Sequence, residues 1–140
     1  MKFLPVNLKN LDSLHDFIEN MGSSSSNFRY FSKRKPEKAI LNHLITLLLY
    51  DQDFVGYGHL DCENGKVWLG ICIKEGNYGK GYGKAMMKRL INSFGGDIYL
   101  SVDKDNTRAY SLYRLFGFKK ISENDTMYYM MKRGKNDTSL

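Results

Sequence analysis

The sequence contains few of the residues on which disulfide-rich, metal-binding or membrane-spanning proteins depend. Its 140 residues include two cysteines, Cys62 and Cys72, which suggest neither a disulfide framework nor metal-ligand spacing. No apolar run approaches the roughly 20 residues that a membrane-spanning helix needs. The first residues, MKFLPVNLKNLDSL, lack the charged-then-apolar layout of a secretory signal. We therefore expect one cytoplasmic domain over residues 1–140, without a metal or a membrane partner, whose residues 133–140 form a flexible tail.

The charge balance favours anionic partners. The formal net charge is +6 and the sequence pI is about 9.2, which suits a nucleic acid, a phosphorylated cofactor or an anionic substrate. However, lysine and arginine are scattered, apart from short basic runs at 33–35 and 132–135. No helix-turn-helix, zinc-finger or RNA-recognition signature is present. We therefore expect no nucleic-acid partner.

A glycine-rich turn between a strand and a helix is the strongest local signal. Residues 71–73 are apolar, 79–83 read GKGYG, and the residues that follow have one apolar face made by Met86, Met87, Leu90, Ile91 and Phe94. The first N–H groups of such a helix are unpaired and the helix dipole adds positive charge. Together they bind anions, most often phosphate.

The turn does not match two well-known nucleotide-binding patterns. The P-loop needs Ser or Thr after Gly-Lys, but Gly83-Lys84 is followed by Ala85. The dinucleotide fingerprint needs a third glycine where Lys84 stands. Taken alone, the turn is also compatible with an ordinary strand-to-helix connection that needs positive φ angles.

Hydrophobic periodicity predicts an α/β (α+β) domain with a mixed sheet of about seven strands flanked by helices. Strands are predicted at 2–8, 43–50, 54–62, 67–73, 97–103, 118–122 and 126–132, and helices at 10–21, after Pro36, after the glycine turn and at 106–116. The strands at 43–73 form an antiparallel meander, with Asn64-Gly65 at one turn. The helix after the glycine turn makes a right-handed crossover. Residues 22–27 are predicted to be a mobile loop.

Two motifs in this order resemble the GNAT superfamily of acetyl-CoA-dependent N-acetyltransferases. The first is GICI at 70–73 followed by YGKGYGKA at 78–85, and the second is NTRAYSLYRLFGF at 106–118. The resemblance implies the acyl-CoA N-acyltransferase fold and acetyl-CoA as co-substrate. In such proteins the pantetheine arm pairs with a strand backbone, here that of Ile71, Cys72 and Ile73.

The resemblance also implies a site for the pyrophosphate, held by backbone N–H groups of the glycine turn. Position 78 is usually Arg or Gln in this family but is Tyr78 here, so Lys80 or Lys84 is expected to supply the missing charge. The cofactor-binding residues expected are Ile71, Cys72, Ile73, Tyr78, Gly79, Lys80, Gly81, Tyr82, Gly83, Lys84 and Asn106. Asn106 matches the family asparagine near the pantetheine, and it is also a suitable helix cap.

Tyr113 matches the family tyrosine that points at the acetyl sulfur. A phenol, with a pKa of about 10, can donate a proton to the thiolate that leaves. A second interpretation is that Tyr113 belongs to the apolar stripe of its helix. The amine must also lose a proton, and His59 and Asp61 share one strand face close to the cofactor strand. His59 with Asp61 as partner or substitute is the predicted base, unless His59 is simply hydrogen-bonded within the sheet.

The acceptor site is predicted at Phe28, Arg29, Tyr30 and Phe31, where flat rings alternate with positive charge. The segment at 28–35 is either a loop or short helix packed by its aromatic residues or a substrate wall in which Arg29 or Arg34 meets a phosphate. We expect a small-molecule amine, with a nucleotide-linked amino sugar preferred. The alternatives are a protein or peptide amine and a non-catalytic acyl-CoA-binding module. The last strand could also pair across a homodimer.

Overall fold

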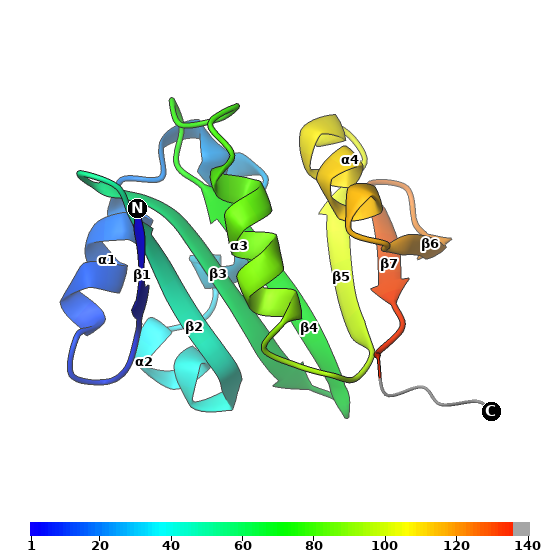
Figure 1. Cartoon of the computed structure of the whole chain (residues 1–140), viewed down its shortest axis with the longest axis horizontal. Helices are drawn as coiled ribbons and strands as arrows, with labels where there is room; N and C mark the ends of the chain where they lie inside the picture. The colour runs from blue at the N-terminus through cyan, green and yellow to red at the C-terminus, as the bar shows by residue number, and fades with distance from the viewer. Residues whose placement is uncertain (136–140) are drawn as a thin grey trace.

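The computed structural model describes residues 1–135, which build one mixed sheet with helices on both faces (Figure 1). The strand order is β1-β2-β3-β4-β5-β7-β6. Gly134 N donates to Asp97 Oδ1 at 2.8 Å, so the chain is still anchored there, and residues 136–140 of the predicted tail lie outside the described residues. None of the helices in the described part is both long and apolar enough to cross a membrane.

The order of elements matches the prediction, with ends shifted by a few residues. The strands are β1 (Lys2–Pro5), β2 (His43–Tyr50), β3 (Phe54–Glu63), β4 (Lys66–Ile73), β5 (Ile98–Asp103), β6 (Lys119–Glu123) and β7 (Met127–Lys132). The helices are α1 (Leu11–Glu19), α2 (Pro36–Ala39), α3 (Tyr82–Ile91) and α4 (Thr107–Leu115). Short 3₁₀ helices are η1 (Gly22–Ser26), η2 (Tyr30–Ser32) and η3 (Ile40–Asn42).

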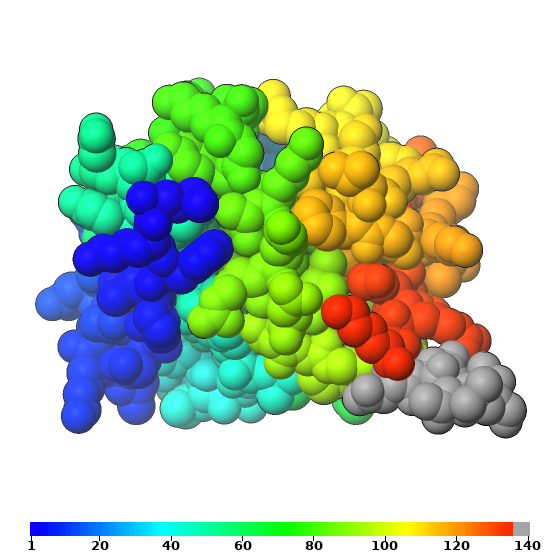
Figure 2. Space-filling model, viewed as in Figure 1, coloured from blue at the N-terminus to red at the C-terminus, as the bar shows by residue number. Residues whose placement is uncertain are grey.

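Two hydrophobic cores lie on opposite faces of the sheet. The core beneath α3 and α4 contains Met86, Leu90 and Tyr113, and the core beneath α1 contains Leu14 and Phe17. β2 contributes to both because its residues 46–49 are all buried, which is typical of a strand covered on both faces. Figure 2 shows α3 packed between the N-terminal part of the chain and α4.

The sheet is split between β4 and β5. These parallel strands pair at Val67↔Ile98 and Trp68↔Tyr99, and no further pairs follow. The other edge of β4 stays paired with β3 as far as Gly56↔Ile73. One edge of residues 69–73 therefore faces an opening rather than a neighbouring strand.

The segment predicted to be a mobile loop at 22–27 instead contains the 3₁₀ helix η1. Ser24 is 8% exposed, and its Oγ donates to the carbonyl oxygen of Ile73 at 2.7 Å. Ser23 Oγ donates to Glu75 Oε1 at 2.6 Å. The prediction was wrong because serine hydroxyls hydrogen-bond backbone groups that are distant in the sequence, and local composition carries no sign of this.

Candidate active site

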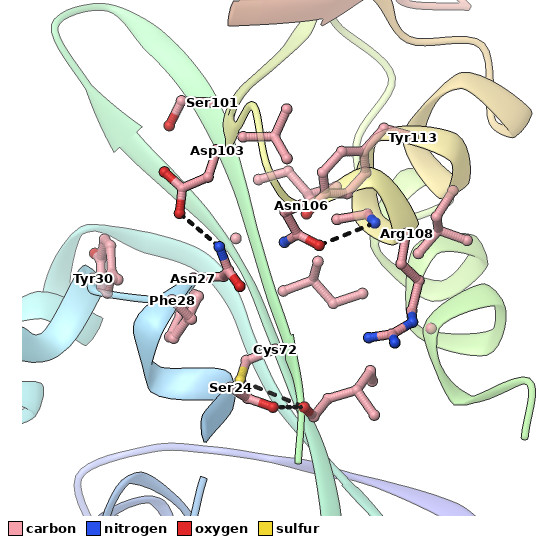
Figure 3. A pocket seen from close by; sticks show the side chains of 18 of the residues that line it. Ser24, Asn27, Phe28, Tyr30, Cys72, Ser101, Asp103, Asn106, Arg108 and Tyr113 are labelled. Atoms are coloured by element: carbon pink, nitrogen blue, oxygen red, sulfur yellow. Dashed lines mark hydrogen bonds between the residues drawn. The ribbon is translucent and has the colours of Figure 1, made fainter. Parts of the chain in front are cut away.

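A cleft of about 840 Å³ opens where β4 and β5 diverge (Figure 3). Of the predicted site residues, all line it except Lys80 and Phe31. Lys80 is exposed, and the Phe31 ring packs edge-on against Tyr30 at a centroid distance of 4.9 Å. Residues from α4 enter the cleft from one side, and residues from the η1–η2 segment face them (Figure 3).

The backbone of β4 offers hydrogen-bonding groups to this cleft at alternate residues. Lys74 N donates to Val55 O of β3 at 2.8 Å, and in an antiparallel pair successive residues point alternately toward and away from the partner. Ile71 and Ile73 therefore direct their N–H and C=O groups into the cleft, whereas Cys72 directs its own toward β3. Ser24 already occupies the Ile73 carbonyl. Within residues 71–73, the groups left for an extended ligand are those of Ile71 and the Ile73 N–H.

The glycine turn fits a phosphate-bearing ligand. Gly79 and Gly81 have φ angles of 75° and 85°, which other residues rarely adopt. A Cβ built on either would meet nothing within 4 Å, so the space above the turn is open. Gly81 also forms the N-terminal cap position of α3, whose first N–H groups carry the partial positive charge that attracts anions.

Asn106 and Tyr113 have structural roles in addition to lining the cleft. Asn106 Oδ1 accepts from Ala109 N at 3.3 Å, so the predicted helix cap is confirmed. Tyr113 is 5% exposed and belongs to the core beneath α4. Its hydroxyl makes no hydrogen bond to other residues in 1–135 and is not a buried unsatisfied atom, so it is open to the cleft. Burial raises the pKa of Tyr113, which keeps the phenol protonated as a donor must be.

The Cys72 thiol lies in the same cleft but is unsuited to nucleophilic attack. Burial raises the pKa of Cys72 to about 12, and the thiolate is the nucleophilic form of cysteine. Its Sγ contacts Met21 Sδ at 3.6 Å. The site therefore favours transfer without an acyl-cysteine intermediate.

His59 is positioned by a hydrogen bond to its ring and by an aromatic neighbour. Tyr57 Oη lies 2.6 Å from His59 Nδ1, and the Tyr30 ring centroid is 4.3 Å from that of His59. On the next strand Gly70 leaves room for the imidazole, because a Cβ there would lie 2.5 Å from Cε1 and Nε2. Burial, followed by the fields of His43 and Arg34, lowers the pKa of His59. The imidazole is therefore neutral near pH 7.

Asp61 is connected to a second histidine through a phenol. Tyr30 Oη donates to Asp61 Oδ2 at 2.8 Å and lies 2.8 Å from His43 Nε2. His43 Nδ1 in turn lies 2.8 Å from Thr46 Oγ1. Burial and then the charge of Arg34 lower the pKa of His43 to about 4. His59 and Asp61 thus share one cluster, in which Tyr30 lies between them.

The two arginines predicted to meet a substrate phosphate are already paired with carboxylates. Arg29 Nη1 and Nη2 lie 2.7 and 2.8 Å from the two oxygens of Asp103. Arg34 lies 3.7 Å from Glu63 and stacks over the Tyr30 ring at 4.3 Å. These pairs join residues far apart in the sequence, so the basic run by itself did not reveal them.

No role was predicted for several residues of the site. They are Ser24, His43, Gly70, Asp103 and Arg108, all of which line the cleft or contact residues that do. Each of these residues contacts a partner on another element, and such contacts cannot be predicted from local sequence. Among residues 1–135, no group of three or more His, Cys, Asp and Glu side chains is arranged to hold a metal ion.

A split mixed sheet with a glycine turn at the start of α3 is the architecture of an acyl-CoA-binding fold. The chain belongs to the acetyltransferase (GNAT) family, and a model of that family matches residues 10–118.

Individual relatives resemble parts of the chain. Over 92 residues it is 38% identical to the spermine/spermidine N(1)-acetyltransferase of Bacillus subtilis, a match that spans 56% of this chain and 60% of that protein. Over 69 residues it is 33% identical to the N-alpha-acetyltransferase RimI of Mycobacterium tuberculosis, 44% of each chain. The match thus covers less than two thirds of either relative. The fold resembles that of yncA from Salmonella typhimurium, determined with acetyl-CoA, with a TM-score of 0.73, 11% identity, and coverage of 100% of this chain and 96% of that one.

Proposed function

We propose that this protein transfers the acetyl group of acetyl-CoA to a primary amine of a small molecule by direct attack. The observation that supports this most is the meeting of three features in one cleft. They are the unpaired backbone edge of β4, the glycine turn at the start of α3 and the open hydroxyl of Tyr113. A cytoplasmic location and a homodimer through β7 remain predictions.

The chain's own residues supply binding and proton transfer. N–H groups of residues 79–84 hold the diphosphate, while Ile71 and the Ile73 N–H pair with the pantetheine arm. Bound acetyl-CoA supplies an activated thioester. Tyr113 donates its proton to the sulfur as the C–S bond breaks and the new C–N bond forms.

The proton of the attacking amine goes to His59 or Asp61, directly or through a water molecule. His59 is neutral and can accept a proton, although burial makes its imidazolium costly. The Tyr30 hydroxyl donates a hydrogen bond to Asp61, and this bond orients the carboxylate at the cleft wall. The two single variants His59→Gln and Asp61→Asn separate these possibilities. Turnover should fall by roughly 100-fold or more in the variant that lacks the base, as expected for removal of a general base.

We favour an acceptor that carries extra positive charge, such as a polyamine. Asp61 lines the cleft and, among residues 1–135, forms no ion pair with a cation, and the resemblance to a spermine/spermidine acetyltransferase supports this class. The nucleotide-linked amino sugar is the second candidate. It requires Arg29 or Arg34 to exchange its carboxylate partner for phosphate. A protein amine is a further candidate, supported by the resemblance to RimI.

The test is CoA release with a panel of acceptors: spermidine, a nucleotide-linked amino sugar, an aminoglycoside and a lysine peptide. We expect turnover with a small amine and a fall of up to a few orders of magnitude in Tyr113→Phe, with acetyl-CoA affinity retained. Tyr110→Phe is the matched control, because Tyr110 lies on the same helix and its ring contacts that of Tyr128 outside the cleft. Turnover of the peptide alone would overturn the small-molecule proposal. Binding without any release would identify a non-catalytic acyl-CoA module.

A further inference from the structure

Arg108 differs from the other arginines that line the cleft. Arg29 and Arg34 pair with carboxylates, whereas Arg108 forms no ion pair with any residue in 1–135. Its guanidinium carbon instead lies 3.9 Å from the centroid of the Tyr78 ring. An arginine stacked on an aromatic face keeps its edge N–H groups free to donate.

The ring beneath Arg108 is itself held in place. The Tyr78 hydroxyl is hydrogen-bonded to Ser24 Oγ, which also donates to the carbonyl of Ile73. Tyr78 is therefore fixed to the end of β4, directly before the glycine turn at Gly79. Figure 3 shows the Arg108 side chain extending from α4 into the cleft. The stack thus positions a cation over the residue that directly precedes the glycine turn.

We propose that Arg108, stacked on Tyr78, binds the diphosphate of acetyl-CoA. In this arrangement a side chain from α4 supplies the polar contact that an Arg or Gln at position 78 supplies in the family pattern. A guanidinium presents parallel N–H groups that match two phosphate oxygens. Tyr78 is then a positioning residue and Arg108 a ligand-binding residue. The inference rests on the proposed function, because it requires that acetyl-CoA binds in this cleft.

Calorimetry with CoA and with 3′-dephospho-CoA tests the assignment. Because a hydrogen bond to a charged group contributes more than a neutral one, Arg108→Gln should weaken CoA binding by roughly 10- to 100-fold. The same loss is expected with 3′-dephospho-CoA, which keeps the diphosphate. Arg108→Lys should lose less, since it keeps the charge without the planar fork. Arg114→Gln is the control, because Arg114 is exposed on the same helix and does not line the cleft.

Substitution of Tyr78 tests whether its ring positions Arg108 for CoA binding. Tyr78→Leu should weaken CoA binding in the wild-type background and have little further effect in Arg108→Gln, because the two residues then act as one unit. Independent effects of the two substitutions would overturn the positioning role of Tyr78.

Each remaining result is decisive. Unchanged affinity in Arg108→Gln, or an equal loss in Arg114→Gln, would overturn the proposal. A loss confined to CoA and absent with 3′-dephospho-CoA would move the contact to the 3′-phosphate and overturn the diphosphate assignment. If the folded wild type ignores CoA, the proposed function fails rather than this inference alone.

Discussion

His59 reaches the acceptor end of the cleft because position 70 of the neighbouring strand has no side chain. A Cβ on Gly70 would lie 2.5 Å from the imidazole, which is closer than two non-bonded carbon or nitrogen atoms approach one another. Gly70→Ala should therefore push His59 aside and reduce turnover by up to roughly 100-fold, the lower end of a general base's contribution. Acetyl-CoA affinity should change little. Steady-state kinetics and calorimetry measure the two effects.

The control for this substitution is a double-mutant cycle with His59→Gln. If Gly70 acts through His59, the double variant should be about as active as His59→Gln alone, because the contact has already been lost. Additive losses would mean that Gly70 acts on the cleft by another route.

His43 makes the stability of the fold depend on pH. Burial lowers its pKa from 6.5 to about 4, so the folded state keeps the neutral ring while the unfolded chain takes up a proton below pH 6.5. Stability is therefore full above pH 6.5 and falls as the pH drops toward 4. His43 alone should cost on the order of 2 kcal/mol of unfolding free energy between pH 7 and pH 5. His59 adds to this in the same direction.

Urea unfolding at pH 7 and pH 5 measures the effect. His43→Gln should lose less free energy of unfolding than the wild type when the pH is lowered. His15→Gln should keep the wild-type pH dependence, because His15 is exposed on α1. An equal loss of unfolding free energy between pH 7 and pH 5 in all three proteins would contradict the proposal that buried His43 causes the pH dependence.

At the scale of elements, the segment from η1 to η2 connects both walls of the cleft. Ser24 binds the end of β4, and Arg29 and Asn27 both donate to Asp103 at the end of β5. Arg29 lowers the pKa of Asp103, so this connection persists well below neutral pH. Asp103→Asn should release the segment, at a cost of about 1 kcal/mol typical of partly exposed ion pairs.

Limited proteolysis at the basic residues of the segment should then be faster, and the KM for the amine should rise more than the KM for acetyl-CoA. Asp105→Asn is the matched control, since Asp105 accepts a hydrogen bond from Asn27 at 3.1 Å but, within residues 1–135, makes none with Arg29. Equal behaviour of the two variants would mean that the Arg29 pair does not hold the segment.

The same segment marks the limit of what could be predicted from the sequence. Strand 43–50 was predicted with its observed ends, and α4 with its Asn106 cap, because periodicity and capping are local. The Arg29–Asp103 pair joins residues 74 apart, whereas the charge of Arg29 alone suggested a phosphate of the substrate as its partner. The glycine turn was predicted from glycine spacing, and diphosphate binding by the N–H groups of residues 79–84 stays a prediction. The stack of Arg108 on Tyr78 was missed because it depends on where the Tyr78 ring lies.

At the scale of the whole molecule, the split sheet divides the fold into two parts. β1–β4 form one part and β5–β7 with α4 the other, and β4 pairs with β5 at only two positions. The crossover helix α3 and the Asp103 contacts supply further links. A ligand lying along the open edge of β4 would contact both parts at once.

Acetyl-CoA should therefore protect both walls of the cleft from amide exchange. At 100 times its Kd a ligand adds about 2.7 kcal/mol to stability, and protection should rise at Ile71 and Ile73 on β4 and near Asn106 on the opposite wall. Cys72 should change less, because its backbone already faces β3. Adenosine 3′-phosphate 5′-diphosphate keeps the diphosphate, lacks the pantetheine arm and is the control; it should protect the glycine turn without protecting Ile71. Protection of the turn alone by acetyl-CoA would mean that the arm does not enter the split, and that the reacting thioester lies elsewhere than beside Tyr113.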